Sequence, residues 1–209
     1  MQLFNAQPAR EFVSYPKNPH HSGEYFFAQT GQMVAYEVMF EYTAYMWLDY
    51  STPVRAIAAQ PMYMGFGNGL GHYPDALYVH GDGDQVVYNV KPSERMDADV
   101  EAQFAACRAV CAEVGWRFEV FDGLPPIVVF NLEFLARYRH SRNAPTARLH
   151  RYIVTMAAHG ALVREFIAAA RKTDAYLMPA LWHLAWKREI RFDEAARITE
   201  NTAIWLATV

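Results

Sequence analysis

Apolar and polar positions follow two different periods along this chain, and the change of period marks the predicted elements. Two runs rich in Val, Tyr and Leu, residues 72–80 and 85–92, flank a Gly-Asp-Gly-Asp cluster. Such runs around a Gly/Asp turn indicate a β-hairpin. Residues 33–50, by contrast, contain no Gly or Pro, and their apolar residues recur at helical spacing. This second run predicts one largely buried helix.

The remaining pattern predicts a mixed first part and a mostly helical second part. Before the hairpin we expect a strand at 25–28 in an N-terminal arm and strands within 52–62 and 63–66. After the hairpin we expect a helix at 97–114. In the second part we expect helices at 147–158, 161–172, 176–186 and 193–198, with short strands at 188–192 and 202–206.

Polar side chains with possible chemistry lie on the two strands of the hairpin. Asn89 and Lys91 share one face of the second strand, while Val90 points the other way and could offer its backbone carbonyl to a metal. Asp75 lies on the same face as Asn89 and Lys91 only if the numbers of two residues that pair across the hairpin sum to an even value. A loop of three or five residues gives such a pairing. A loop of four residues would need a bulge. The alternative is a plain surface hairpin whose Pro74-Asp75 is only turn chemistry.

Two carboxylates occupy the apolar run before the hairpin. Glu37 and Glu41 lie four residues apart and would share one face of the predicted helix. Burying two carboxylates is costly unless a metal or a cation compensates them. The sequence therefore places a second acidic element upstream of Asp75.

An acidic residue, a second oxygen ligand and a lysine two positions on is the pattern with which PD-(D/E)xK nucleases hold a divalent metal. Residues 31–94 resemble, more closely, the TnsA endonuclease family within that superfamily, the subunit of heteromeric transposases that cuts the non-transferred strand at transposon ends. The matching features, in order, are Tyr36-Glu37 with Glu41, Leu48-Asp49-Tyr50, Val54 and Ile57 leading to Gln60-Pro61, His72 with Pro74-Asp75, and Val90-Lys91-Pro92. Further on, residues 112–120, with Gly115-Trp116, Phe118 and Val120, are similar to the helix end and strand that follow the nuclease core in this family.

The resemblance implies a role for each matching residue. Its catalytic glutamate falls on Glu41, its metal-binding aspartate on Asp75, its second ligand on Asn89 and its lysine on Lys91, with the Val90 carbonyl completing the metal shell. The residues expected behind the metal ligands or against DNA are Glu37, Gln60 and His72. The implied reaction is phosphodiester hydrolysis assisted by Mg²⁺ or Mn²⁺.

One position departs from the general nuclease pattern. Asn89 replaces the usual Asp or Glu, although the TnsA group itself can carry glutamine there. A neutral amide oxygen should bind the metal more weakly than a carboxylate, yet Mg²⁺ keeps several waters and tolerates a sparse site. The alternative is a catalytically inactive nuclease-fold module for DNA binding or complex assembly; a phage or repair nuclease is also open.

Charge divides the chain into two unlike parts. Residues 1–132 hold 7 Lys and Arg against 15 Asp and Glu, a net charge of −8, whereas residues 133–209 hold 12 against 7, a net charge of +5. We therefore expect an α/β, restriction-endonuclease-like domain at 1–132, a mixed sheet flanked by helices. A small, mostly helical, winged-helix-like domain at 133–209 would bind DNA or protein. The resemblance implies a DDE-type transposase subunit and an AAA+ regulator as protein partners.

Composition limits the remaining possibilities. No apolar run approaches the roughly 20 residues that span a bilayer, and no signal peptide opens the chain, so we expect a cytoplasmic protein without membrane contact. Cys107 and Cys111 lack histidines at ligand spacing and are expected to be reduced thiols in the core. His20 and His21 are expected in a solvated loop.

Overall fold

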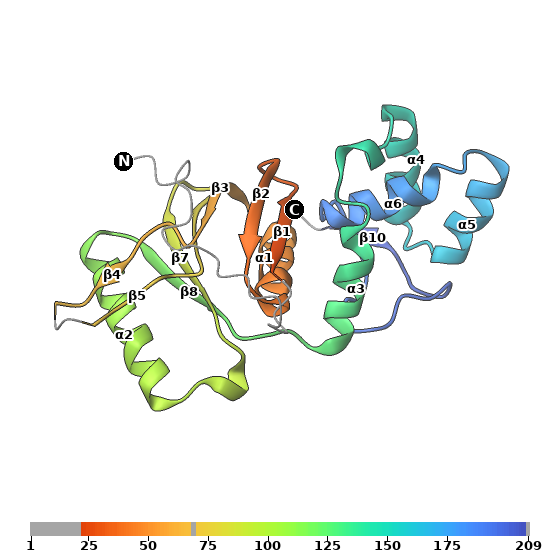
Figure 1. The fold of residues 1–209 in the computed structure, drawn as a ribbon. Helices are drawn as coiled ribbons and strands as arrows, with labels where there is room; N and C mark the ends of the chain where they lie inside the picture. Colours follow the sequence, from red (N-terminus) through yellow and green to blue (C-terminus); the bar gives the residue numbers. More distant parts are fainter. Residues whose placement is uncertain (1–21, 68–69, 208–209) are drawn as a thin grey trace. The chain divides into compact units, whose positions relative to one another are not determined.

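A computed structural model describes residues 22–67 and 70–207 of the 209-residue chain (Figure 1). The chain divides into two compact units between Gly123 and Leu124. The boundary predicted after residue 132 would fall inside a helix, α3 (Pro126–Ala136), which belongs to the second unit. The charge division is unaffected by this shift, because residues 124–132 carry no charged side chain.

A four-stranded mixed sheet forms the centre of the first unit. Its strands are β3 (Val54–Ala59), β6 (Ala76–His80), β7 (Gln85–Val90) and β8 (Arg117–Phe121), side by side in that order. The first three strands pair antiparallel, while β7 and β8 pair parallel and are joined through α2 (Ala98–Glu113). A parallel pair requires such a crossover. The prediction of an α/β fold with a mixed sheet flanked by helices is confirmed at this level.

The helices α1 (Met39–Ser51) and α2 cover opposite faces of this sheet (Figure 1). Phe40 of α1 contacts Phe121, which pairs with Val90 in the register of β7 and β8. Val87, three residues before Val90 on β7, packs instead against the thiols of α2. Because residues on a strand alternate between faces, Val87 and Val90 face opposite ways. We call the two sides the α1 face and the α2 face.

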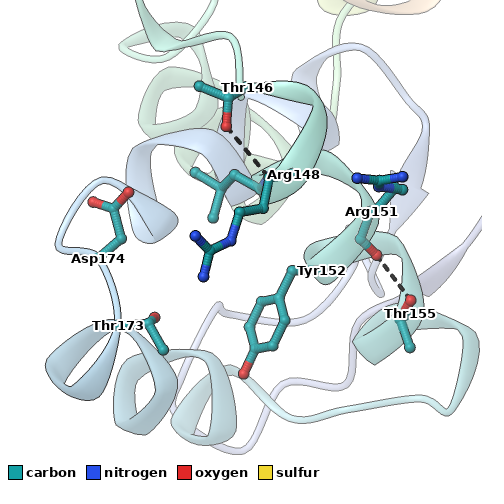
Figure 2. Close-up of a pocket in the computed structure, with 8 residues that line it drawn as sticks. Thr146, Arg148, Arg151, Tyr152, Thr155, Thr173 and Asp174 are labelled. Atoms are coloured by element: carbon teal, nitrogen blue, oxygen red, sulfur yellow. Dashed lines mark hydrogen bonds between the residues drawn. The ribbon is translucent and has the colours of Figure 1, made fainter.

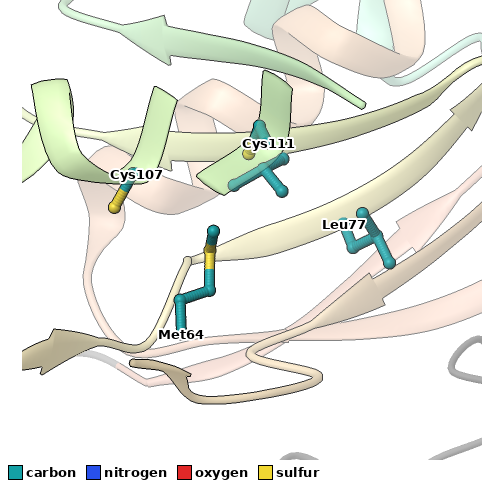
Figure 3. Close-up of a cluster of buried hydrophobic side chains, with 5 residues drawn as sticks. Met64, Leu77, Cys107 and Cys111 are labelled. Carbon is teal, nitrogen blue, oxygen red and sulfur yellow. The ribbon is translucent and has the colours of Figure 1, made fainter. Parts of the chain in front are cut away.

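Cys107 and Cys111 lie in the apolar core of the α2 face, as the sequence predicts. Both are free thiols, 0% and 1% exposed, and Figure 3 shows them on α2 above Met64 and Leu77. Burial raises the pKa of the Cys107 thiol to about 11. These side chains therefore contribute as small apolar groups rather than as metal ligands.

The predicted helix over residues 33–50 is wrong in its first part. Residues 32–36 form β2 (Gln32–Tyr36), which pairs antiparallel with β1 (Gly23–Phe27), and α1 begins only at Met39. An apolar run without Gly or Pro does not by itself distinguish a strand from a helix. A two-stranded ribbon of β4 (Met64–Gly65) and β5 (Gly71–His72) and a 3₁₀ turn, η2 (Ser93–Arg95), complete the unit.

A buried carboxylate joins the β1–β2 hairpin to the end of α1. Asp49, 2% exposed, accepts hydrogen bonds from the Tyr25 hydroxyl at 3.1 Å and from the backbone N–H groups of Ala28 and Gln29 at 2.8 and 3.1 Å. Charge-assisted hydrogen bonds of this kind compensate the burial of a carboxylate. This acidic position is thus explained by the fold.

The second unit is mostly helical. After α3 come η3 (Ser141–Asn143), α4 (Ala147–Ala158), α5 (Val163–Lys172) and α6 (Leu177–Trp186), followed by β9 (Ile190–Arg191) paired antiparallel with β10 (Trp205–Leu206). The buried helix α6 packs against α3, α4 and α5. The prediction for α4 is confirmed at both ends, and Thr146 caps the helix by accepting the N–H of Leu149 at 3.3 Å. The winged-helix-like character stays a prediction.

The helix predicted at 193–198 is wrong. The Asp193 carboxylate accepts the N–H of Ala195 in a turn that does not continue, and the side-chain amide of Asn131 occupies the carbonyls of Glu194 and Ala196. A six-residue helix without a buried face lacks the packing that stabilises short helices. Among the described helices, none has the length and apolar character needed to cross a bilayer. His20 and His21 lie outside the described residues.

Candidate functional site

The register of the β6–β7 hairpin places Asp75 opposite Asn89. Ala76 pairs with Tyr88 and Leu77 with Val87, so the next pair outward is residue 75 with residue 89, an even sum. The His80 N–H donates to the Asp84 carbonyl at 2.8 Å, which leaves residues 81–83 as a three-residue loop, one of the two lengths that give an even sum. Asp75, which directly precedes β6, therefore stands beside Asn89 at the end of the sheet.

Three hydrogen bonds from three different segments fix Asp75. Its backbone carbonyl accepts the Tyr45 hydroxyl of α1 at 2.9 Å and the Gln60 N–H after β3 at 3.0 Å. Its carboxylate Oδ2 accepts the N–H of Val90 on β7 at 2.7 Å. Gln60 adopts a φ of 40°, an uncommon value for a residue other than Gly. The first helix and three neighbouring strands thus converge on one half-buried aspartate.

The same hairpin leaves the Val90 carbonyl without its usual backbone partner. The N–H of Val90 points toward β6, and in a strand the carbonyl of a residue points to the same side as its N–H. The residue opposite Val90 in this register is Pro74, which has no N–H to donate. The ladder therefore ends at Val90, whose carbonyl oxygen faces Pro74.

Glu41 lies at the start of α1 and is 8% exposed. Its Oε2 accepts the backbone N–H of Glu37 at 2.6 Å. Because Glu37 precedes the helix, the two glutamates do not share a helical face as expected; they are joined through the Glu37 backbone. An acidic side chain in the first turn of a helix is stabilised by the exposed N–H groups there, so Glu41 has a structural role whether or not it binds a metal.

Tyr45 is a site residue that the sequence reasoning missed. It is 1% exposed, and burial raises the pKa of its hydroxyl well above the usual value. The negative charges of Glu41 and Asp75 raise this pKa further, so both carboxylates lie within electrostatic reach of the hydroxyl. The available signal was its position one turn after Glu41, on the same face of the helix.

A second group of polar side chains lies on the α2 face. Asn89, 0% exposed, shares its face with Val87, and its Oδ1 lies 2.5 Å from Nε2 of His72. The His72 ring also approaches Phe104 of α2, with 6.2 Å between ring centroids. Burial lowers the pKa of His72; the hydrogen bond with Asn89 raises it, and the nearby charge of Lys91 lowers it again. His72, Asn89 and Lys91 therefore form one neighbourhood.

The predicted site residues thus fall into two groups that meet at the hairpin end. Glu41 and Asp75 gather around Tyr45, whereas Asn89 and Lys91 gather with His72. The register joins the groups, since Asp75 is opposite Asn89.

Buried polar atoms without a partner mark the same end of the sheet. Among the described residues, Oε1 of Gln60 and Nδ2 of Asn89 are buried and make no hydrogen bond. An unpartnered oxygen such as that of Gln60 can be completed by a water or a cation, whereas the Asn89 N–H group needs a water or another acceptor. The oxygen of Gln60 is a further ligand of the hard type that Mg²⁺ prefers, either directly or through a water.

A magnesium ion at this end of the sheet would have only a sparse set of ligands. Within residues 22–67 and 70–207, no group of three or more His, Cys, Asp or Glu side chains is placed to hold a metal. A metal here would therefore depend on the two carboxylates together with neutral oxygens, namely the Val90 carbonyl and the amide of Asn89 or Gln60. Mg²⁺ retains waters and accepts such a set, whereas Zn²⁺ prefers nitrogen and sulfur.

No protein-family model matches this chain, and no curated protein is significantly similar to it.

Proposed function

We propose that this protein is a metal-dependent DNA endonuclease whose site lies at the end of the β6–β7 hairpin. The observation that carries the proposal is the placement of Asp75, which is held by α1, by the segment after β3 and by β7 at the point where the Val90 carbonyl lacks a ladder partner. The order helix, three antiparallel strands, crossover helix and parallel strand supports a restriction-endonuclease-like arrangement.

Four side chains and one carbonyl would perform the reaction. Asp75, Glu41, the Val90 carbonyl and Asn89 would hold Mg²⁺ or Mn²⁺, which when bound activates a water and stabilises charge on a phosphodiester. Lys91 would orient the nucleophile or neutralise the negative charge that develops on the phosphate oxygens. Its position on the same strand face as Asn89, near His72, supports this role.

His72, Gln60 and Tyr45 would position these groups. The bond between His72 and Asn89 fixes the orientation of the amide and uses one lone pair of its oxygen, so a metal would take the other lone pair. Tyr45 and the Gln60 N–H hold the Asp75 backbone. Glu37 would act through its backbone on Glu41.

The transposon role is the finer part of the proposal. Cleavage of one strand at transposon ends, together with a DDE-type transposase subunit and an AAA+ regulator in the cytoplasm, follows from the family resemblance. The net charge of +5 on the second unit supports contact with DNA.

A non-catalytic DNA-binding or assembly module is the second candidate. Two observations favour it: Asn89 is neutral, and its amide oxygen is already engaged by His72. A site of this kind would have lost its metal while keeping the architecture around it. The two candidates differ in whether any metal elicits strand cleavage.

The test is nicking of supercoiled plasmid in Mg²⁺ or Mn²⁺, alone and with any transposase encoded beside the gene. We expect nicking by the wild type and at least a 100-fold lower rate in Asp75→Asn. Residues that hydrogen-bond to a metal ligand commonly contribute about 10- to 100-fold to metal affinity or activity, and a direct ligand should contribute more. Asp84→Asn is the matched control, since Asp84 lies at the exposed far end of the same hairpin. Nicking that survives Asp75→Asn would refute the proposed site. Absence of nicking under every metal and partner condition would favour the module.

A further inference from the structure

A pocket in the second unit carries chemistry that the proposed nuclease does not use. It lies between α4 and the connection from α5 to α6 and has a volume of about 550 Å³, within the usual range for ligand sites (Figure 2). Polar and charged side chains dominate its lining, which consists of Thr146, Arg148, Leu149, Arg151, Tyr152, Thr155, Thr173 and Asp174.

Two arginines supply its positive charge. Arg148 and Arg151 are both exposed, and within the part of the chain that the structure describes neither guanidinium forms an ion pair or a hydrogen bond. Figure 2 shows the Arg148 guanidinium directed into the space between Asp174, Thr173 and Tyr152. A planar guanidinium without a protein partner is suited to bind a phosphate through two parallel hydrogen bonds.

The threonine hydroxyl groups of the lining differ in whether they can donate a hydrogen bond to a ligand. Those of Thr155 and Thr173 donate to the carbonyls of Arg151 and Ala169, each at 2.8 Å, and so offer only lone pairs to a ligand. The Thr146 oxygen accepts the Leu149 N–H, which leaves its proton for an external acceptor. A donor therefore stands beside the arginines.

An aromatic ring and a carboxylate complete the pocket. Tyr152 is 42% exposed, and its ring forms one wall. On the opposite side, Oδ1 of Asp174 accepts the Tyr176 N–H at 2.8 Å, and the carboxylate stands at the pocket wall. A carboxylate repels a bare phosphate but accepts the N–H groups on the edge of a nucleobase.

We propose that this pocket binds one unpaired nucleotide of a nucleic-acid strand. The phosphate contacts Arg148, the base stacks on Tyr152, and an N–H on the base edge donates to Asp174. An unpaired nucleotide is required because a base inside a duplex has its faces stacked and its edge paired. The excess of 12 Lys and Arg over 7 Asp and Glu in residues 124–209 favours a polyanion. The site does not rest on cleavage, since this binding needs no metal.

The test is fluorescence anisotropy of the full chain with a labelled 20-nucleotide single strand, in EDTA and at several salt concentrations. Arg148→Ala should weaken binding about 5- to 10-fold and make the slope of log K against log salt shallower by about 0.7, the value for one lost phosphate contact on a single strand. Arg171→Ala removes the same charge from an exposed position of this unit outside the pocket, and it should change the affinity less than about 2-fold.

A second pair of variants tests the base. Tyr152→Ala should weaken binding at least about 5-fold with no change in salt slope, because stacking carries no charge. Tyr176→Ala is the control, being 39% exposed and outside the lining. Wild-type binding to a blunt duplex of the same length should be weaker than to the single strand.

Three results would overturn the proposal. One is equal loss of affinity in Arg148→Ala and Arg171→Ala, which would indicate a diffuse positive surface. Another is full affinity in Tyr152→Ala, which would exclude a stacked base. The last is no binding of single strands by the wild type. Since all measurements are made without metal, these results are independent of whether the first unit cuts DNA.

Discussion

The two faces of the central sheet differ in what they bury. The α2 face is an apolar core of Met64, Leu77, Val87, Cys107 and Cys111. The α1 face instead buries hydroxyl groups: Tyr45, Tyr78 and Tyr88 lie on it, and burial raises the pKa of each. The Tyr78 hydroxyl donates to the carboxylate of Glu119 at 2.7 Å.

The α2 face contributes mainly to stability, whereas the α1 face also positions polar groups. A dry apolar face gains from burial alone and specifies no chemistry. Each buried hydroxyl group needs a hydrogen-bond partner, and for the Tyr45 hydroxyl this partner is the backbone carbonyl of Asp75. The α2 face becomes polar only at the same end of the hairpin, where His72 meets Asn89. Polar groups from both faces therefore meet where β6 begins and β7 ends.

The largest expected effect comes from the apolar face. Leu77→Ala, at a fully buried position, should lower the free energy of unfolding by about 2–5 kcal/mol, because it removes packed methyl groups and leaves a cavity. Urea denaturation followed by tryptophan fluorescence measures the change. A loss below about 1 kcal/mol would show that the α2 face is not the core that its burial indicates.

A smaller effect is expected from the polar face. Tyr45→Phe removes one hydrogen bond to the Asp75 carbonyl and should cost about 0.5–1.5 kcal/mol of stability. If this face positions the site, the same variant should slow metal-dependent nicking by more than its stability loss explains, measured where both proteins are fully folded. Unchanged nicking would assign Tyr45 to the core alone.

The smallest effect concerns pH. Burial lowers the pKa of His72, so the unfolded chain binds more protons and the contribution of this group to stability rises with pH. It is complete above the unfolded pKa of about 6.5 and is lost as pH falls below that value. The stability difference between wild type and His72→Gln should therefore shrink from pH 7.5 to 5. A difference that grows on acidification would contradict the neutral histidine bound to Asn89.

Some of this architecture was predictable because it depends on local pattern. The β6–β7 hairpin follows from two β-rich runs around a Gly/Asp cluster, although the sequence left its loop length open, and α4 follows from an apolar-periodic run. The missed helix α3 begins with Pro126 directly after Pro125, residues that usually indicate a loop, yet proline is favoured in the first turn of a helix.

The arrangement of the site was less predictable because it depends on long-range contacts. The sequence brings Glu41 and Asp75 together only through a family resemblance, and nothing local indicates that Tyr45 stands between them. The partition of Glu41 and Asn89 between opposite faces depends on how α1 and α2 pack. Likewise, the Val90 carbonyl is left without a partner only because Pro74 is placed opposite by the register.

The most direct test of the central claim is Mn²⁺ binding, measured as the loss of the free Mn²⁺ signal in electron paramagnetic resonance. The account predicts one site in the wild type, weakened at least about 10-fold by Asp75→Asn and by Glu41→Gln but not by Asp84→Asn. Asn89→Asp should preserve or tighten binding, because it restores a carboxylate. Equal Mn²⁺ affinities in the wild type and Asp75→Asn would contradict a metal site at the end of the hairpin.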